Sequence, residues 1–366
     1  MPRRAPKLGT APVMRLERRH ETSRAALLLA PVGAIGFTLL VSALLVLWAG
    51  APVGRTYALL LQGGFGSVFA WSETLTRATP LILTGLAATV AFKARLYNIG
   101  AEGQFYGGAL AAVAVGGLHG GTGFALPAWL LFPLMMAAAA CVGALLLLGP
   151  ALMKNKLGVD EVVTTLLINF IVLLGASALL DGPMKDPSAM GWPQSVSLQP
   201  ELELSRLVAQ TRVHTGLLWA GVLALLAWVL FKYTVIGFDI RALGANARAA
   251  AFAGVPVTRT LVLVALISGA LAGLAGAIEV AGRTSYVTLD MSPGYGYSGI
   301  VIAMLAGLHP LGVLAAGVFV AGVQVGADTM SRAIGVPTYI ADVIVAASLI
   351  AVLVATLLTQ YRARWK

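Results

Sequence analysis

The sequence contains very few of the side chains that catalytic and metal sites usually need. It has 366 residues with one cysteine, Cys141, and four histidines. A single cysteine excludes an intramolecular disulfide framework and a cysteine-based metal cluster. His119, His214 and His309 lie at the edges of apolar segments and far apart in the chain. We therefore predict no metal site and no proton relay.

Charged residues are also scarce. Asp, Glu, Lys and Arg make up 11% of the chain, whereas 58% of it is hydrophobic. Soluble domains contain about 25% charged residues, so this composition is typical of a polytopic helical membrane protein. Apart from the first residues, no polar stretch exceeds roughly thirty residues, which is too short for an independent catalytic domain.

The sequence has no phosphate-binding loop. It lacks the pattern G-x-x-x-x-G-K-[ST] and contains no Gly-Lys dipeptide. Such a loop holds the phosphates of ATP, so this chain has no visible means of hydrolysing ATP, and we predict no cofactor bound to it. The net charge of +10 comes from basic residues that flank apolar segments. We interpret them as topology determinants and as contacts to lipid headgroups, and not as a nucleic-acid site.

The apolar segments predict an all-α polytopic membrane protein with about ten membrane-crossing segments. A helix needs about 20 residues to cross the hydrocarbon layer. The segments are 25–48, 72–92, 103–118, 127–151, 159–180, 216–231, 260–281, 297–308, 310–330 and 338–358. The segment 297–308 is too short to cross unaided, and the stretch 52–71 is expected to be an outside loop or a surface helix. The first segment is longer than the core of a signal peptide, which is about 7–15 residues, so we favour a retained anchor over a cleaved leader.

Basic residues orient these segments. Most of the 25 Lys and Arg residues fall on one side of the predicted topology, which places both termini in the cytoplasm by the positive-inside rule. The predicted organisation is a basic cytoplasmic tail at 1–24, a transmembrane domain at 25–358 and a cytoplasmic tail at 359–366. Within the domain, 181–213 forms an outside loop rich in proline, and 232–259 forms a cytoplasmic loop.

The cytoplasmic loop 232–259 reads KYTVIGFDIRALGANARAAAFAGVPVTR. Residues Asp239 to Ala253 predict one short helix, ended by Gly254 and Pro256. Gly244 would let the surface of another protein approach the backbone closely. Two interpretations remain open on these features: a lever that a soluble partner pushes, or a plain connector between two spans.

Two polar breaks interrupt the apolar pattern. Residues 97–108 read YNIGAEGQFYGG and residues 286–299 read YVTLDMSPGYGYSG. Each joins a glycine-containing break to aromatic residues and a short helix, and the two lie on opposite sides of the predicted topology, as an inverted repeat requires. Irregular backbone at membrane depth is tolerated where it is buried in protein or lines a wet cavity. The alternative is a pair of interfacial loops with aromatic belt residues.

A few further polar residues lie within or near the ends of apolar segments. Asn169 and Glu279 either line a path through the membrane or hydrogen-bond between helices. Asp328 and Asp342, near predicted outer ends, favour capping or interfacial roles. The pair Gly269 and Gly273 predicts close helix packing.

Four stretches together resemble the membrane permease subunits of ABC importers of the simple-sugar and nucleoside class. They are LYNIGAEGQ at 96–104, GVDEVVTTLLIN at 158–169, RALGANARAAAFAG at 241–254 and SGALAGLAGAIE at 268–279. Each is weak alone because glycine and alanine match easily, but all four occur in order. The NIGAEGQ form and the long polar N-terminus resemble the nucleoside type more than the ribose type.

This resemblance implies a ten-helix subunit of the plasma membrane of a prokaryote (the inner membrane) that is not itself an enzyme. It implies a second permease subunit, often a non-identical one, two cytoplasmic ABC ATPases that bind ATP and Mg²⁺, and an extracytoplasmic substrate-binding lipoprotein. It also implies that the cytoplasmic loop docks on an ATPase. The residues that would couple the two are Arg241, Ala242, Leu243, Gly244, Asn246, Ala250, Ala251 and Gly254.

The resemblance and the polar breaks together predict a nucleoside path. Residues expected to line or support it are Asn98, Glu102, Gln104, Asn169, Glu279, Tyr295, Tyr297 and Ser298. A neutral, amphipathic nucleoside suits aromatic stacking with a few hydrogen bonds. The alternatives are the same role for a simple sugar such as ribose, or an ion-coupled secondary transporter. The latter predicts a cluster of ionisable groups in the spans, and an intramembrane enzyme predicts a nucleophile–base pair; neither pattern is evident.

Overall fold

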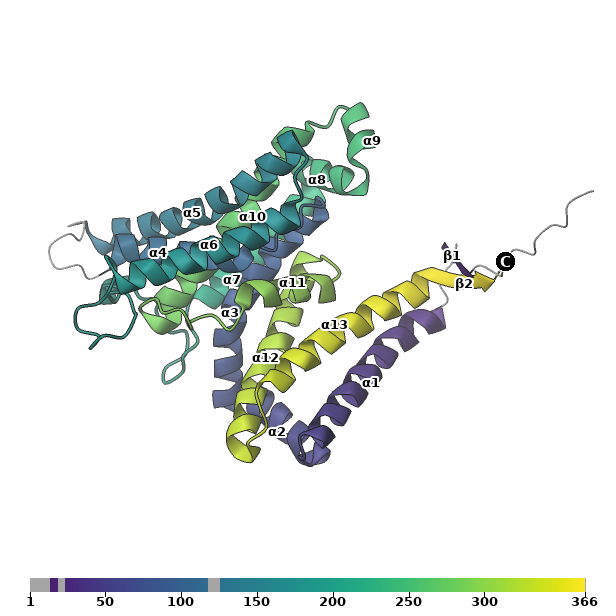
Figure 1. Cartoon of the computed structure of the whole chain (residues 1–366), viewed down its shortest axis with the longest axis horizontal. Coiled ribbons are helices and arrows are strands. Elements are labelled where there is room, and N and C mark those ends of the chain that lie inside the picture. The colour runs from purple at the N-terminus through teal and green to yellow at the C-terminus, as the bar shows by residue number, and fades with distance from the viewer. Residues whose placement is uncertain (1–13, 19–23, 118–125, 366) are drawn as a thin grey trace, which may run out of the picture. The chain divides into compact units, whose positions relative to one another are not determined.

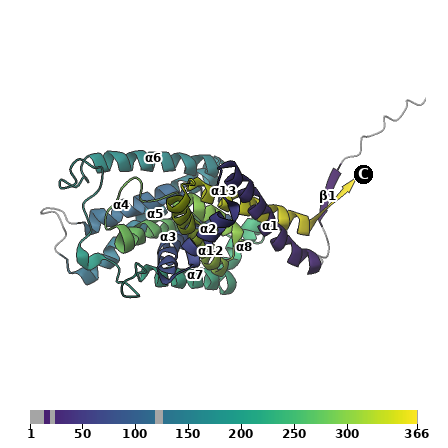
Figure 2. The same cartoon turned by 90° about the horizontal axis from the view of Figure 1, so that it is seen from below.

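The structure is a computed structural model that describes residues 14–18, 24–117 and 126–365 (Figures 1 and 2). The chain divides into two compact units, which are described separately. The first consists of Met1–Thr56 with Val336–Lys366, and the second of Tyr57–Gly335. Helix α2 (Val53–Phe65) begins in the first unit and continues into the second.

The first unit brings the two ends of the chain together. Helix α1 (Arg24–Trp48) lies against α13 (Tyr339–Gln360), as Figure 1 shows. Strand β1 (Met14–Arg18) pairs antiparallel with β2 (Tyr361–Trp365), with Met14 opposite Trp365. The sequence predicts tails at 1–24 and 359–366, of which 1–13, 19–23 and 366 lie outside the described residues. Their pairing was not predicted, because two short basic segments so far apart in sequence carry no pairing signal.

The second unit is a helical bundle. Its helices are α3 (Val68–Lys93), α4 (Ala101–Gly116), α5 (Ala128–Leu157), α6 (Glu161–Asp181), the 3₁₀ turn η1 (Pro200–Leu202), α7 (Gly216–Tyr233), α8 (Val235–Ala245), α9 (Ala247–Phe252), α10 (Val257–Glu279), the π-helical turn η2 (Val280–Thr284), α11 (Tyr295–Leu305) and α12 (Pro310–Ile334). We call the end of the bundle that carries residues 182–215 the loop end, and the opposite end the α8–α9 end.

Helix α10 lies at the centre of this bundle and contacts α3, α4 and α5. Small residues let these helices approach closely. A Cβ atom on Gly269 would lie 2.3 Å from the carbonyl oxygen of Gly143, and one on Gly108 would lie 2.1 Å from that of Gly273. No side chain fits at such separations, so glycine is required at these crossings. The predicted packing role of Gly269 and Gly273 is confirmed.

Among the described residues, six helices are long and apolar enough to cross a membrane, or seven if residues 36–48 and 53–65 count as one broken span. The six are α3, α5, α6, α7, α10 with η2, and α12. The expected count of about ten is therefore not reached by this test, because α4 and α11 are shorter helices that follow breaks and only the short part Asp342–Ala351 of α13 is counted. In α3, 83% of the apolar window is buried, against 17% in α6, so α3 belongs to the core and α6 exposes a lipid-type surface.

The segment 182–215, which contains nearly all of the predicted outside loop 181–213, packs back onto the bundle. Ser195 N–H donates to the carbonyl oxygen of Val287 at 3.0 Å, and Leu204 N–H to that of Ala281 at 2.8 Å. Leu198 and Leu202 are buried, and both approach Gly116 at the end of α4. The segment therefore holds the end of α4 and the second break in place.

Candidate functional site

The first break, residues 94–100, is fixed in the interior by side-chain amides. Asn98 and Gln104 form a reciprocal pair with two N–H···O bonds of 2.9 Å. Asn98 also donates to Ser268 Oγ at 3.2 Å, and Ser268 donates to the carbonyl oxygen of Ala87 at 2.7 Å. All three side chains are fully buried. The break thus attaches to α10 and α3 well inside those helices, so α4 starts within the bundle.

Asn169 of α6 clamps the same break from the other side. Its amide nitrogen donates to the carbonyl oxygen of Ile99 at 2.8 Å, and its oxygen accepts from Gly103 N–H at 2.8 Å. The nitrogen also lies 3.2 Å from the hydroxyl of Tyr297. Of the two roles open for Asn169, the structure contains the interhelical hydrogen bonds.

The second break, residues 285–294, begins at the loop end and returns to the interior. Tyr106 donates its hydroxyl proton to the carbonyl oxygen of Leu289 at 2.5 Å, and Ser292 N–H donates to that hydroxyl at 3.3 Å. Ser292 Oγ accepts from the N–H of Tyr295, the first residue of α11, at 2.9 Å. Thr84, in the middle of α3, donates to the carbonyl oxygen of Tyr295 at 2.9 Å. Helix α11 therefore also starts within the bundle.

The two breaks begin at opposite ends of the bundle, as predicted, but they meet. The carboxylate of Glu102, in the first turn of α4, accepts the N–H of Gly296, in the first turn of α11, at 2.6 Å. The rings of Phe105 and Tyr295 contact edge to face at 5.7 Å. A Cβ on Gly296 would lie 2.2 Å from Glu102 N, so only glycine permits this crossing. Helix N-termini carry partial positive charge, so a carboxylate between two of them is well placed.

A second buried acid joins α10 to the first turn of α11. Glu279, 0% exposed, pairs with Arg283 four residues later, and Arg283 donates to the hydroxyl of Tyr295 at 2.8 Å. Burying a carboxylate is costly without a cation, and Arg283 supplies one. Glu279 therefore contacts Arg283, and Arg283 in turn opens onto a cavity.

This cavity, of about 590 Å³, lies at the loop end between α2, α3 and α12. It is lined by charged pairs: Arg77 with Asp328 at 2.8 Å, and Arg212 with Glu73 at 3.6 Å. Gln62, Phe69, Thr76, Arg283, Thr329 and Arg332 complete most of the lining. Asp328 was expected to have a capping or interfacial role, whereas it forms an ion pair. Glu73 and Arg212 were not predicted, because no pattern in the sequence connects a loop residue to α3.

The α8–α9 end differs from the prediction. The expected single helix from Asp239 to Ala253 is wrong: α8 ends at Ala245 and α9 begins at Ala247. Asn246 between them has extended backbone, and its side-chain oxygen accepts from Arg248 N–H at 3.0 Å and Ala249 N–H at 3.1 Å. Asparagine competes with the helix in this way and favours an N-cap, which explains the break.

Gly244 permits a close contact within the chain. A Cβ on Gly244 would lie 1.9 Å from the carbonyl oxygen of Lys93, the last residue of α3. The space that a side chain at Gly244 would need is therefore filled by α3, while the role of this glycine in docking a partner stays a prediction.

The other predicted coupling residues fall into two groups. Leu243 and Ala250 are buried and Ala242 is half-buried, whereas Arg241, Asn246, Ala251 and Gly254 are exposed. Phe252, not predicted, is 96% exposed at the end of α9. Phe252 could not be recognised as exposed from the sequence alone, because that required knowing that a separate short helix, α9, ends at this residue.

Residues 70–353 match the family described as branched-chain amino acid transport system / permease component. The chain belongs to this permease family.

Relatives of the permease support the match along most of its length. It is 35% identical over 322 residues to the guanosine ABC transporter permease protein NupP of Bacillus subtilis, covering 87% of this chain and 91% of the relative. It is 31% identical to the nucleoside ABC transporter permease protein NupB of Lactococcus lactis, covering 87% and 88%. A glucose ABC transporter permease protein of Haloferax volcanii is 34% identical over 84% and 82%. The chain is thus an ABC transporter permease component and a multi-pass membrane protein.

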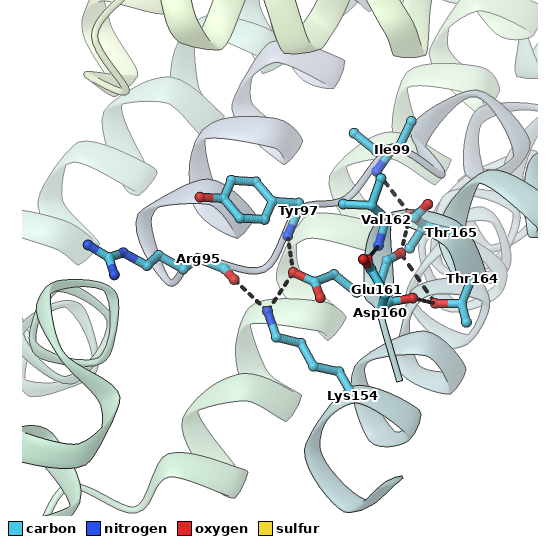
Figure 3. A network of polar contacts seen from close by, with 9 residues as sticks. All are labelled: Arg95, Tyr97, Ile99, Lys154, Asp160, Glu161, Val162, Thr164 and Thr165. Carbon is cyan, nitrogen blue, oxygen red and sulfur yellow. Dashed lines mark hydrogen bonds and ion pairs between the residues drawn. The ribbon is translucent and has the colours of Figure 1, made fainter. Parts of the chain in front are cut away.

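Two of the four stretches that resemble permease subunits, 96–104 and 158–169, meet at the start of α6 (Figure 3). Lys154 donates to Glu161 at 2.5 Å and to the carbonyl oxygen of Arg95 at 2.6 Å, and Glu161 accepts from Tyr97 N–H at 3.3 Å. Thr165 accepts from Ile99 N–H at 3.2 Å. The stretches 96–104 and 158–169 therefore form one structural element of the permease, in which α6 fixes the backbone of the first break.

The predicted path residues of the permease accordingly lie in one region. Asn98, Gln104, Asn169, Glu102 and Tyr295 form the contacts that hold the two breaks together, and Glu279 joins them through Arg283. Tyr297 is 40% exposed and Ser298 is half-buried, both on the first turn of α11. Both side chains are therefore at least partly exposed in the chain.

Proposed function

We propose that this permease forms the translocation path for nucleosides in an ATP-driven importer. The observation that carries the proposal is the similarity to proteins named as guanosine and nucleoside permeases over nearly the whole of each chain. A second candidate substrate is a simple sugar, because the relative named as a glucose permease is almost as similar. An ion-coupled mechanism has less support, since the permease family is one of ABC transporters.

In this proposal the α8–α9 end faces the cytoplasm and the loop end faces outward, with ten crossing segments and both termini inside. The basic residues favour this orientation, because Lys93, Arg95, Lys154, Lys156 and Arg248 all belong to the α8–α9 end. The membrane is the plasma membrane of a prokaryote, the inner membrane where there are two.

The importer also contains a second permease, cytoplasmic ATPases and an extracytoplasmic binding protein. Support for a second permease comes from Bacillus subtilis, where a second guanosine permease protein, NupQ, also resembles this chain, at 28% identity over 67% of it. The exposed surface of α8 and α9, with Phe252 at its end, docks on an ATPase that binds ATP and Mg²⁺.

The contacts support a specific route for coupling. The ATPase moves α8, and α8 contacts the end of α3 directly at Gly244 and Lys93. The end of α3 leads into the first break, whose next helix, α4, holds the start of α11 through Glu102. A displacement of α8 therefore reaches the crossing of α4 and α11 through three adjoining elements. Opening that crossing connects the loop-end cavity with the cytoplasm.

In this route some of the path residues hold the structure and others contact the nucleoside. Asn98 and Gln104 satisfy each other and are fully buried, so they hold the break. Tyr297 and Ser298 line the path and offer an aromatic face and a hydroxyl to the nucleoside. The charged cavity at the loop end receives the nucleoside from the binding protein.

Uptake of labelled guanosine tests the proposal in cells that carry the complete system. We expect uptake that depends on this chain, ceases with an ATPase subunit unable to hydrolyse ATP, and is reduced by unlabelled uridine but not by ribose. Competition by ribose or glucose alone would transfer the proposal to a sugar. Uptake that continues without ATP and stops with an ionophore would establish the ion-coupled alternative.

A further inference from the structure

A second cavity, of about 430 Å³, lies at the α8–α9 end. Its walls are the end of α3 with the first break, the end of α8, and the end of α11. Lys93, Arg95 and Arg241 all line it, and no acidic residue of the described chain does. The proposed path does not use this cavity.

These three cations have no acidic partner in the part of the chain that the structure describes. By contrast, Lys154, which lies nearby, pairs with Glu161 at 2.5 Å. At the loop end Arg77 and Arg212 are likewise paired with acids. Three like charges around one cavity repel one another. An anion in the cavity removes that repulsion.

Two residues that line the cavity have unusual backbone. Arg95 and Leu308 both adopt the left-handed conformation, with φ of 55° and 57°. Strained backbone of this kind persists only where its surroundings fix it, and it concentrates at functional sites. At Arg95 the fixing contact is Lys154, which binds the carbonyl oxygen of Arg95 at 2.6 Å. Figure 3 shows the guanidinium of Arg95 extending away from Lys154 and Glu161.

We propose that this cavity binds a phosphate-bearing anion. Two guanidinium groups and one ammonium suit phosphate oxygens, because arginine binds them through paired N–H donors and lysine as a point charge. Both a soluble phosphate and the headgroup of an anionic lipid present this chemistry, and basic pockets between helices are typical headgroup sites. Because α8 forms one wall, occupancy ties the proposed coupling element to the end of α3. Only this link to coupling, and the location of the cavity on the cytoplasmic side, rest on the proposed function.

The test uses the purified full-length chain in nanodiscs, with two probes. In discs of phosphatidylcholine alone, binding of inorganic phosphate is titrated by ³¹P NMR. In a second arm, phosphatidylglycerol retained by the chain is counted by native mass spectrometry. We expect saturable binding in at least one arm, and a loss of about tenfold or more in affinity for Lys93→Gln with Arg95→Gln, since each removes charge-assisted hydrogen bonds.

Two matched variants keep the test decisive. Lys156→Gln with Arg259→Gln removes the same charge from exposed positions at the same end, away from the cavity, and should change affinity by less than about twofold. Met304→Trp fills the cavity and keeps every charge, so it should abolish binding even if the charge variant misfolds. Binding of phosphate identifies a soluble ligand, and binding of phosphatidylglycerol alone identifies a lipid. Equal loss in cavity and control variants, or full binding by Met304→Trp, overturns the site whether or not the chain transports nucleosides.

Discussion

The carbonyl oxygen of Lys93 occupies the position that a side chain on Gly244 would need. A Cβ built on Gly244 would lie 1.9 Å from that oxygen, well inside any normal contact. Since Lys93 is the last residue of α3, this contact fixes α8 directly against the point where the first break begins. A glycine in a helix costs about 1 kcal/mol relative to alanine, and the close contact with Lys93 explains why glycine is nevertheless found at this position.

Gly244→Ala should therefore destabilise the isolated subunit. The methyl group forces α8 away from α3, and overpacking of this kind costs about 1–3 kcal/mol. Thermal unfolding of the purified chain, followed by size-exclusion chromatography, measures the effect. Gly221→Ala in α7 is the control, because a Cβ there meets nothing within 4 Å, and it should be neutral or mildly stabilising. An unchanged unfolding temperature for Gly244→Ala would refute the contact.

Phe252→Ala should leave the stability of the subunit unchanged and weaken its association with the ATPase. The side chain is 96% exposed and contributes little to the subunit's own stability, so the unfolding temperature should not change. Co-purification of the ATPase should fall, because aromatic anchors often contribute about 2 kcal/mol or more to an interface. Phe170→Ala, an exposed phenylalanine on α6, controls for loss of apolar surface. Normal ATPase association by the Phe252 variant would remove α9 from the proposed interface.

Gly244 and Asn246 show which features of the structure could not be predicted from the sequence. Glycine and alanine spacing predicted close packing at Gly244, but the partner surface belongs to α3, which is distant in sequence. Local patterns do not specify which distant backbone fills a gap. Likewise, the pattern at 239–253 predicted one helix because alanine and arginine favour helix, while the side chain of Asn246 competed successfully with the backbone.

The breaks were predictable and their meeting was not. Polar, glycine-containing stretches at 97–108 and 286–299 disrupt hydropathy, and the structure has breaks in both. Their contact through Glu102 and Gly296 depends on how far each break returns into the bundle, which is decided by hydrogen bonds such as that of Thr84 to Tyr295. The charged cavity at the loop end was missed for the same reason, since Glu73 and Arg212 are brought together only by folding.

Orientation can be tested by cysteine labelling. In a Cys141→Ser background, Met190→Cys should react with an impermeant maleimide added to intact cells, because Met190 is fully exposed in the segment at the loop end. Ala247→Cys, exposed at the start of α9, should react only after the membrane is permeabilised. The reverse pattern would place α8 and α9 outside, where no ATPase could reach them.

Acid should weaken the second unit through His214. This side chain is buried beside Gly216 and Gly282, and burial together with the charge of Arg283 lowers its pKa to about 4. The unfolded chain, with an ordinary histidine pKa near 6.5, then binds more protons between pH 6.5 and 4. Stability is therefore full above pH 6.5 and falls towards pH 4, by at most about 1.4 kcal/mol per pH unit.

The unfolding temperature of the purified chain, measured across this range, should show that fall. His214→Gln should flatten this part of the pH profile. His309→Asn provides the comparison, because His309 is exposed and asparagine can still cap α12. If both variants keep the wild-type pH profile, another group is responsible for acid sensitivity.

Variants of Glu102 distinguish a role in holding α11 against α4 from a role in transporting the substrate. Its carboxylate accepts the N–H of Gly296, so Glu102→Ala leaves that N–H without a partner and should cost about 1–3 kcal/mol of stability. Glu102→Gln keeps an acceptor oxygen at the same place and removes only the charge. If the residue serves to hold α11 against α4, the glutamine variant should fold normally and retain guanosine uptake within about twofold, while the alanine variant loses both. A glutamine variant that is stable, binds the ATPase and yet fails to transport would show instead that the negative charge itself acts on the substrate or on the opening of the path.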